Sequence, residues 1–438
     1  MPAGLQLRDF GCPKCEQKAR LDPRFVQWCT ECGYGADPNP PVLRRRAARR
    51  SEREQRRSRG LFESLRTAPD LRPTSAIGVS VTVLSVLVHL AGLALLALPI
   101  LFVVNDPGAP WSSILLLLCV LAFLTVRPRL PKPRLDQGTG LSRDAAPKFY
   151  ALLDRCAVEL GCQVPDQVCF DLQFNAYTGV DGLRRRSFLV LGMPLWTVLS
   201  GPERIALLGH ELGHQVNGDT THGQLAASAR RSVHQWTRLL NPRQTAFERH
   251  RNRLMTRHNW GGFGGLGALL APVAMAILFA PFFLFALGCR ALLTRLDLYC
   301  GQRAEYLADE LGARLAGSEA AYGLLGKLAL AESITGFLIA ERNRRGTANQ
   351  VDQSRLWSSV AEYIDSVPET ERQRRKIVDR LRNTRTDRSH PANHLRSALV
   401  ETRSQHAGAI KLSAQEWAEI DAELAGGYLS AARRLLRS

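Results

Sequence analysis

The chain has 438 residues, of which 45% are hydrophobic and 22% charged, and its formal net charge is +18. This length allows two to three domains with a substantial core, which excludes a single small module. The positive charge is unevenly spread, because residues 41–60 hold nine arginines against two glutamates.

Four cysteines near the N-terminus form two C-x-x-C pairs, CPKC and CTEC, which are separated by thirteen residues. Two such pairs can direct four thiolates at one tetrahedral zinc ion, and a ribbon this small otherwise lacks the core that it needs to fold. Disulfides are the alternative, and a cytoplasmic N-terminus argues against them. We therefore predict a structural zinc ribbon over residues 1–40, with one zinc ion held by Cys12, Cys15, Cys29 and Cys32.

Residues 41–75 form an arginine-rich linker. A run of like charge is most often a solvated, flexible segment. The sharper alternatives are a segment that flanks a membrane on its cytoplasmic side and a segment that binds nucleic acid. The apolar residues that follow favour the membrane and disfavour nucleic acid as a partner.

Two uncharged stretches follow this linker, Ala76–Val104 and Pro107–Val126. About 20 apolar residues span a bilayer, so each stretch is long enough to cross it. Basic residues flank the pair at both outer ends, and the loop between the stretches holds one acid and no base. By the positive-inside rule we predict a transmembrane helical hairpin over residues 76–126, with its two ends, and hence the N-terminus, in the cytoplasm.

Residues 135–400 have the pattern of a mostly helical α+β domain. Apolar side chains recur at helical spacing over residues 142–160. Residues 167–171, 174–179 and 187–192 have the pattern of short strands, with a hairpin-type turn signal at Asp181-Gly182. We expect a small antiparallel sheet here, and a separate helical segment over residues 401–438.

The sequence GHELGHQVNGD, residues 209–219, ends a helix that begins near Pro202. His210 and His214 lie one turn apart on the same face, a spacing at which two imidazoles can reach one zinc ion. Glu211 would then point towards the water that the metal activates, as a zinc hydrolase requires. The alternative is a surface helix with solvated histidines, and this short motif alone does not decide between them.

A catalytic zinc ion needs a third protein ligand, and residues 303–315, RAEYLADELGARL, offer one. Glu305 and Asp309 lie four residues apart on a predicted helix. A glutamate in such a setting is usually a carboxylate at the rim of a core. The alternative is that Glu305 is a zinc ligand and that Asp309 orients one of the histidines.

Three motifs, HELGH, then EYLAD, then SHPANHLR near the C-terminus, together resemble the membrane zinc metalloendopeptidases of the HtpX and CAAX prenyl endopeptidase family. The sequence FNAY before the zinc helix also resembles the strand on the substrate side in that family. The resemblance covers residues 142–400 and leaves the cysteine ribbon outside it. It implies a gluzincin-like metallopeptidase domain.

The resemblance also implies roles for individual residues. His210, His214 and Glu305 would bind a catalytic zinc ion, Glu211 would act as the general base, and Asp309 would hold a zinc-binding histidine.

Further roles concern the substrate. His390, in the sequence SHP, would donate a hydrogen bond to the developing oxyanion. An ordinary loop histidine before a proline is the alternative. Asn175, Ala176 and Tyr177 would bind an extended substrate as an added strand, and we place Arg396, from the motif that contains His390, among the substrate-binding residues.

Another uncharged apolar run, Phe263–Cys289, lies between the histidines and Glu305. One full crossing of the membrane there would put His214 and Glu305 on opposite sides, where they could not share a zinc ion. We therefore expect a bent or re-entrant hairpin broken at Pro272 or Pro281, or a helix that lies at the membrane surface.

These features predict an integral membrane zinc endopeptidase with one catalytic and one structural zinc ion and an active site facing the cytoplasm. Its substrates would be membrane or misfolded proteins, in membrane-protein quality control. One alternative is a protease that processes prenylated proteins, which would need a large membrane chamber. Another is a non-catalytic membrane scaffold that uses its ribbon to bind a partner.

Overall fold

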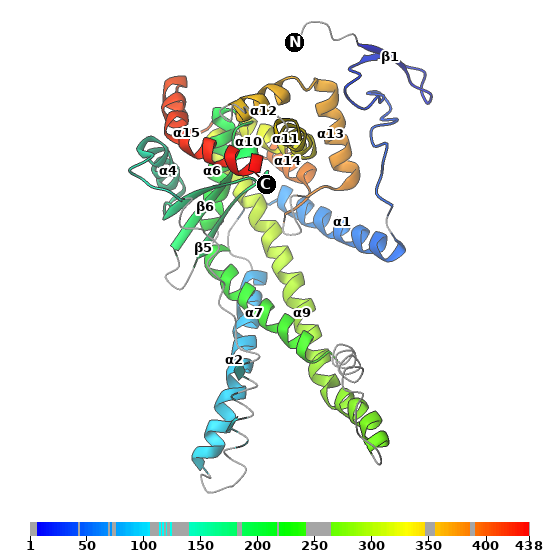
Figure 1. Ribbon diagram of the computed structural model, residues 1–438, viewed down its shortest axis with the longest axis vertical. Helices are drawn as coiled ribbons and strands as arrows, with labels where there is room; N and C mark the ends of the chain where they lie inside the picture. Colours follow the sequence, from blue (N-terminus) through cyan, green and yellow to red (C-terminus); the bar gives the residue numbers. More distant parts are fainter. Residues whose placement is uncertain are drawn as a thin grey trace. The chain divides into compact units, whose positions relative to one another are not determined.

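A computed structural model describes residues 7–42, 44–68, 71, 76–105, single positions between 114 and 124, 140–181, 186–216, 219–241, 264–346, 355–385 and 390–437. The chain divides into two units (Figure 1). Unit 1 comprises residues 1–73, 132–220 and 301–438, and unit 2 comprises residues 74–131 and 221–300. Helices predominate among the described residues, and strands form small sheets, so the predicted α+β, mostly helical class is confirmed.

Unit 1 contains a four-stranded sheet with the strand order β3-β4-β6-β5. β4 (Gln167–Asp171) and β6 (Arg186–Gly192) are parallel, whereas β3 (Gly140–Leu141) is antiparallel to β4, and β5 (Ala176–Asp181) is antiparallel to β6. The predicted antiparallel sheet is therefore wrong, because the sheet is mixed. The turn signal predicts the β5–β6 hairpin, but β6 rather than β5 is the neighbour of β4. β5 is consequently an edge strand of the described sheet.

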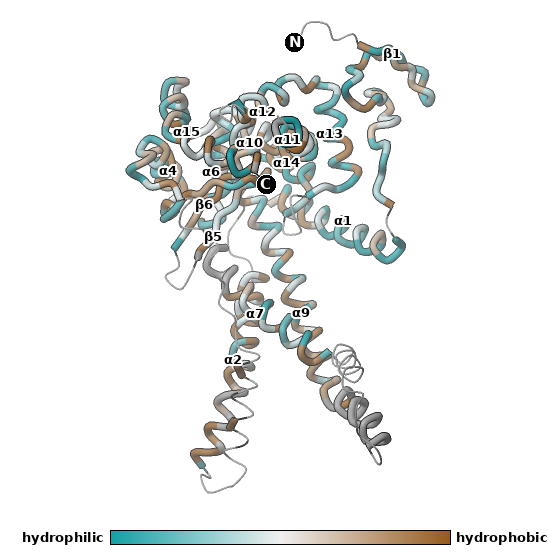
Figure 2. The backbone as a smooth tube through the Cα atoms, viewed as in Figure 1, coloured by the Kyte–Doolittle hydropathy of each residue, from teal (hydrophilic) through white to brown (hydrophobic). Residues whose placement is uncertain are grey.

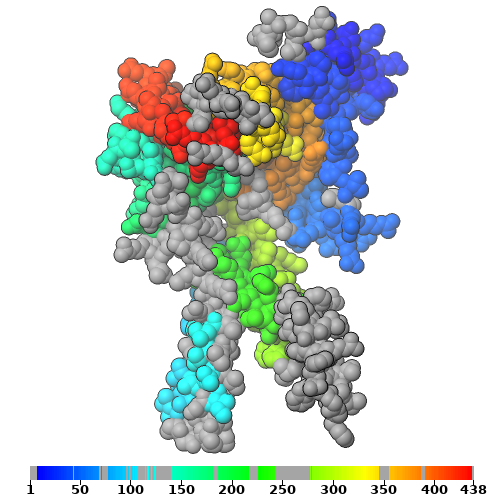
Figure 3. Space-filling model, viewed as in Figure 1, coloured from blue at the N-terminus to red at the C-terminus, as the bar shows by residue number. Residues whose placement is uncertain are grey.

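Most helices of unit 1 share one hydrophobic core with this sheet. Leu153, Leu189, Leu208, Leu324 and Leu424, from five separate elements, are all buried in it. The helices that contribute are α4 (Pro147–Leu160), α5 (Met193–Trp196), α6 (Gly201–Val216), α10 (Ser318–Leu328), α11 (Ala331–Gly346), α12 (Leu356–Asp365), α14 (Asn393–Thr402) and α15 (Ala414–Arg437). α13 (Glu369–Arg382) packs against α14 instead. Figure 3 shows the red C-terminal segment packed beside the yellow segment of unit 1.

The C-terminal helix α15 is part of this core rather than an appendage. The Glu423 carboxylate accepts hydrogen bonds from the backbone N–H groups of Lys148 and Phe149, both at 2.9 Å, at the start of α4. Such N–H groups have no partner within their own helix, and a carboxylate beside them stabilises the helix. α15 therefore completes the fold of unit 1.

The N-terminal part of unit 1 holds an antiparallel hairpin, β1 (Arg8–Gly11) and β2 (Lys18–Leu21), followed by helix α1 (Arg45–Arg66). We expected residues 41–75 to be a solvated linker, and this is wrong over α1. Leu61, Phe62 and Leu65 of α1 are buried, and α1 packs against α14. Their helical spacing is inconspicuous in the sequence because arginines surround it.

Unit 2 contains α2 (Ala76–Asn105), α7 (Asp219–Leu239) and the first part of α9 (Gly264–Ala316). Among the described residues, two helices are long and apolar enough to cross a membrane, Ile77–Ala94 in α2 and Phe279–Ala316 in α9. Figure 2 shows brown, hydrophobic residues along α2. The second arm of the predicted hairpin, residues 107–126, lies largely outside the described residues, so the hairpin stays a prediction.

α9 is one continuous helix that includes Pro272 and Pro281, so the expected bent or re-entrant hairpin is wrong. Each proline removes one backbone hydrogen bond, and helices of this length absorb such a loss where neighbouring groups compensate it.

Instead, α7 and α9 run antiparallel within unit 2. Arg230 of α7 pairs with Asp297 of α9, and further along α7 the Arg290 guanidinium of α9 donates to Thr237 Oγ1 at 3.2 Å. Residue numbers thus rise along α7 while they fall along α9. The chain therefore runs out along α7 and back along α9. His214 and Glu305 can then lie on the same side of a membrane and share a metal ion.

Within unit 1, α6 crosses the last turns of α9 at very short range. A Cβ atom added at Gly312 would lie 2.7 Å from the carbonyl oxygen of Ala206, and one added at Gly209 would lie 2.9 Å from Cα of Gly312. A Cβ atom at Gly213 would lie 3.1 Å from Cα of Ala308. Small residues four apart on both helices allow this approach, as they do where membrane helices pack closely.

Gly312→Ala should therefore destabilise unit 1 by about 1–3 kcal/mol, the usual cost of overpacking a core. Denaturant or thermal unfolding of the purified chain measures this. Gly336→Ala in α11 is the matched control, because its Cβ atom would meet nothing within 4 Å. The control should be neutral, or more stable by up to about 1 kcal/mol. Equal stability of the two variants would contradict the close crossing.

Candidate metal centre

Three side chains meet where α6 crosses α9. The rings of His210 and His214 lie edge to face on α6, with 4.9 Å between their centroids. The carboxylate of Glu305 lies between them: Oε2 is 3.5 Å from Nε2 of His210, and Oε1 is 3.5 Å from Nε2 of His214. The structure thus brings together the three residues that the motifs suggest as ligands.

These separations suit a single metal ion. Ligands roughly 2.0–2.1 Å from a tetrahedral zinc ion lie roughly 3.3–3.4 Å from one another, which is close to the observed spacing. Oε2 of Glu305 is buried and has no hydrogen-bond partner in the part of the chain that the structure describes. A buried carboxylate oxygen without a donor is costly unless a cation compensates it. Two imidazoles and one carboxylate therefore fit a catalytic zinc ion.

The buried charges around this point do not balance by themselves. Among the described residues around this point, Glu211, Glu305 and Asp309 are three buried carboxylates, and Arg396 supplies one buried guanidinium. Burial disfavours the His210 imidazolium, but the nearby carboxylates of Asp309 and Glu305 outweigh burial and raise the pKa of His210 to about 10. A divalent cation would neutralise the same negative field.

Arg396 of α14 holds Asp309 against His210. Its Nη2 and Nε donate to the two oxygens of Asp309 at 2.6 and 2.8 Å, and Oδ1 of Asp309 lies 3.0 Å from Nδ1 of His210. Arg396 is only 3% exposed. Its guanidinium is engaged inside the protein with Asp309, and the expected role in substrate binding stays a prediction.

Glu211 and His390 lie beside these residues. Glu211 is buried, and its backbone carbonyl accepts a hydrogen bond from Thr178 Oγ1 of β5 at 3.2 Å, which ties α6 to the edge of the sheet. His390 lies between α13 and α14, and its Nε2 is 3.2 Å from Oε1 of Glu305. Glu211 directly follows His210 in the sequence, and His390 contacts Glu305, so both residues lie near the three candidate ligands.

The strand suggested for substrate binding is the edge strand β5 with the residue before it. The carbonyl of Asn175 accepts a hydrogen bond from the backbone N–H of Gly192 at 2.9 Å. Ala176 is buried, whereas Tyr177 is 37% exposed and packs edge to face on Phe188. Of these residues, the side chain of Ala176 is therefore inaccessible to a substrate, whereas that of Tyr177 is accessible.

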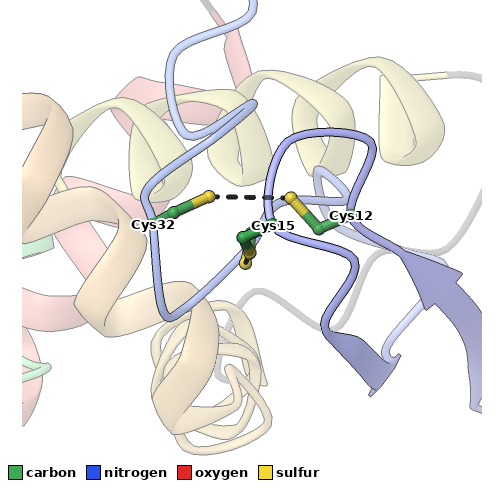
Figure 4. A group of neighbouring side chains, drawn as sticks. Cys12, Cys15 and Cys32 are labelled. Carbon is green, nitrogen blue, oxygen red and sulfur yellow. Dashed lines mark hydrogen bonds between the residues drawn. The ribbon is translucent and has the colours of Figure 1, made fainter.

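Cys12, Cys15, Cys29 and Cys32 form a second cluster of ligand type. The Sγ atoms of Cys12 and Cys32 are 3.6 Å apart, and those of Cys15 and Cys29 are 3.5 Å apart. Figure 4 shows Cys12 and Cys32 facing each other, with Cys15 beside them. All four thiols are free, and sulfurs roughly 2.3 Å from a tetrahedral zinc ion lie roughly 3.8 Å apart. The cluster fits a closed four-thiolate site.

The cysteine segment is anchored on α13. The Arg382 guanidinium donates to both oxygens of Asp37, at 2.7 and 2.9 Å, and lowers the pKa of that carboxyl. Nη1 of Arg374 donates to the carbonyl oxygen of Ala36 at 2.7 Å. The sequence carries no signal for these contacts, because more than 300 residues separate the partners.

Residues 146–403 match the model of peptidase family M48. No curated protein and no solved structure matches the chain. The matched region includes His210, His214, Glu305, Asp309 and Arg396, and leaves the four-cysteine cluster outside. Because the match covers more than half of the chain and the whole cluster at the crossing of α6 and α9, the chain belongs to peptidase family M48, a family of metallopeptidases.

Proposed function

We propose that this chain is a membrane-bound zinc endopeptidase. The observation that carries the proposal is the Glu305 carboxylate, which lies buried at 3.5 Å from both imidazoles with one oxygen lacking a hydrogen-bond donor among the described residues. In a member of a metallopeptidase family, this donor set supports zinc at His210, His214 and Glu305.

A zinc ion at these ligands would supply Lewis-acid activation of the scissile carbonyl and of the attacking water. Glu211, next to His210 on α6, accepts the proton of that water and passes it to the leaving amine. His390 donates a hydrogen bond to the carbonyl oxygen as negative charge develops there. Asp309 and Arg396 act on His210: they hold Nδ1 so that Nε2 stays turned towards Glu305.

The substrate would be an extended polypeptide that pairs with β5. An extended peptide can add to a sheet at its edge strand, and β5 is the edge strand of the described sheet. Thr178 fastens β5 to the helix that carries the histidines. Backbone pairing reads little of the substrate's sequence, which suits misfolded or damaged proteins. Together with the two helices able to cross a membrane, this supports a role in membrane-protein quality control.

Two alternatives have less support. A protease for prenylated proteins would enclose a long apolar chain, and the described residues offer two helices able to span a membrane, or up to three if α10 and α11 form one bent span. A non-catalytic scaffold would have no use for the buried carboxylates at the crossing, although the cysteine cluster could still bind a partner.

Glu211→Gln should lower peptidase activity by about 10²–10⁴-fold, since the general base is lost. Zinc content at the crossing should stay unchanged, because Glu211 is not a ligand. Hydrolysis of casein and elemental analysis of the same preparation measure both. Glu159→Gln, at an exposed position of α4, is the control and should retain activity. Near wild-type cleavage by Glu211→Gln would refute this mechanism.

Cys12→Ser should release one of two zinc ions per chain and unfold the cysteine segment, because a segment this small depends on its metal. The ion at the crossing should remain, since its ligands come from α6 and α9. Cys162→Ser, outside the cluster, is the control and should keep both ions. Loss of both ions from Cys12→Ser would show that the two sites are one structural unit.

The positive-inside rule predicts that unit 1 lies in the cytoplasm. Single cysteines at Asn105, Asp144 and Glu319, all exposed positions, can be introduced after removal of the native cysteines outside the cluster. An impermeant maleimide added to intact cells should label position 105 only. Labelling of positions 144 and 319 should require opening of the membrane. Labelling of these two from outside would reverse the orientation.

A further inference from the structure

Helix α1 separates its charges from its buried residues. At about 100° per residue, the seven arginines from Arg45 to Arg57 fall within an arc of about 140° around the helix axis. The buried residues Ser58, Leu61, Phe62 and Leu65 fall within a separate arc of about 100°. All seven arginines are exposed. We call this set, Arg45 to Arg57, the arginine face.

The buried residues fix only the second half of α1. Nη1 of Arg403 donates to the carbonyl oxygens of Leu65 and Ala68 at 3.2 and 3.1 Å, and Ser58 Oγ donates to Gln302 Oε1 at 3.3 Å. No residue of α1 before Ser58 is buried. The helical turns that carry the arginine face therefore contribute no fully buried side chain to unit 1, and Ala48, Ser51 and Gln55 are only half-buried.

The arginine face is also unfavourable for the helix that bears it. Arg45, Arg49, Arg53 and Arg57 follow one another at a spacing of four residues, at which like charges destabilise a helix. Arg50 pairs with Glu54 at 3.1 Å, but both side chains are exposed and such a pair contributes little. A short helix without packing is marginal in water, so this half of α1 needs an anionic partner to remain ordered.

We propose that the arginine face binds the anionic headgroups of membrane phospholipids. The proposal rests on the membrane location proposed above. Arg66 ends α1 ten residues before Ala76 begins α2, and a segment of ten residues reaches at most about 35 Å. If α2 crosses the membrane, α1 is tethered near its surface, where an anionic leaflet attracts arginine within about a Debye length. The tether favours lipid over nucleic acid.

Hydrogen–deuterium exchange of the full chain in nanodiscs tests this. Backbone amides of residues 46–57 should exchange at least about tenfold more slowly in discs with about 30% phosphatidylglycerol than in neutral phosphatidylcholine discs. High salt should abolish the difference, because the attraction is screened. Equal exchange in the two kinds of disc at low salt would overturn the proposal.

Matched variants separate charge from helix stability. Substitution of Arg46, Arg49, Arg53 and Arg57 by Gln should remove the lipid effect, whereas substitution of the same four by Lys should retain it, since Lys keeps the charge and a similar helix propensity. Loss in both variants, or in neither, would contradict binding through these charges. Protection by an RNA or DNA oligonucleotide without protection by anionic discs would identify nucleic acid as the partner and overturn the proposal.

The readout also distinguishes this inference from the proposed function. Exchange in α1 does not depend on peptidase activity, so an inactive chain can still show the lipid effect. A chain that enters neither kind of disc would refute the membrane location and this inference together. Entry into both discs without protection of residues 46–57 would refute this inference alone.

Discussion

The close crossing of α6 and α9 is the constraint on which the rest of the site depends. Gly209, Gly213 and Gly312 let the two backbones approach closely, so His210 and Glu305 come within 3.5 Å of each other although both are buried. Larger residues would separate the helices by more than metal ligands tolerate. The same close packing buries the carboxylates. Because the effective dielectric constant is lower in a protein interior than in water, buried carboxylates attract a divalent cation more strongly. The glycines that allow the two helices to pack closely are therefore also required for the metal ligands to meet.

The site residues that share one helix can be predicted from the sequence, whereas a contact between residues far apart in the sequence cannot. His210 and His214 share a helix face because of their spacing, and Glu305 with Asp309 repeats that spacing on a second helix. Small residues four apart in both segments are a further signal in the sequence that the two helices cross closely. Arg396 gives no such signal: it lies 87 residues from Asp309, and its burial follows from how α14 packs.

The fold shows the same division between local and distant information. The β5–β6 hairpin follows from a turn signal at Asp181, whereas the parallel pairing of β4 with β6 depends on which strand lies beside β4. The helical period of Leu61 and Leu65 in α1 is obscured by arginines that outnumber the apolar residues. In α9, Pro272 and Pro281 suggest a break by local propensity, but the helix continues through both.

The antiparallel pair of α7 and α9 sets a condition on any membrane topology. If α9 crosses the bilayer, the chain must cross in the opposite direction between Val216 and Gly264, because His214 and Glu305 lie 3.5 Å apart. α7 is the described helix in that interval, and it runs opposite to α9. Its Arg230 is paired with Asp297, and pairing lowers the cost of an arginine inside a membrane. α7 can thus cross the membrane in the direction opposite to α9, although its hydropathy is too low to identify it as a span. The condition is that α9 supplies the negative charge that pairs with its arginine.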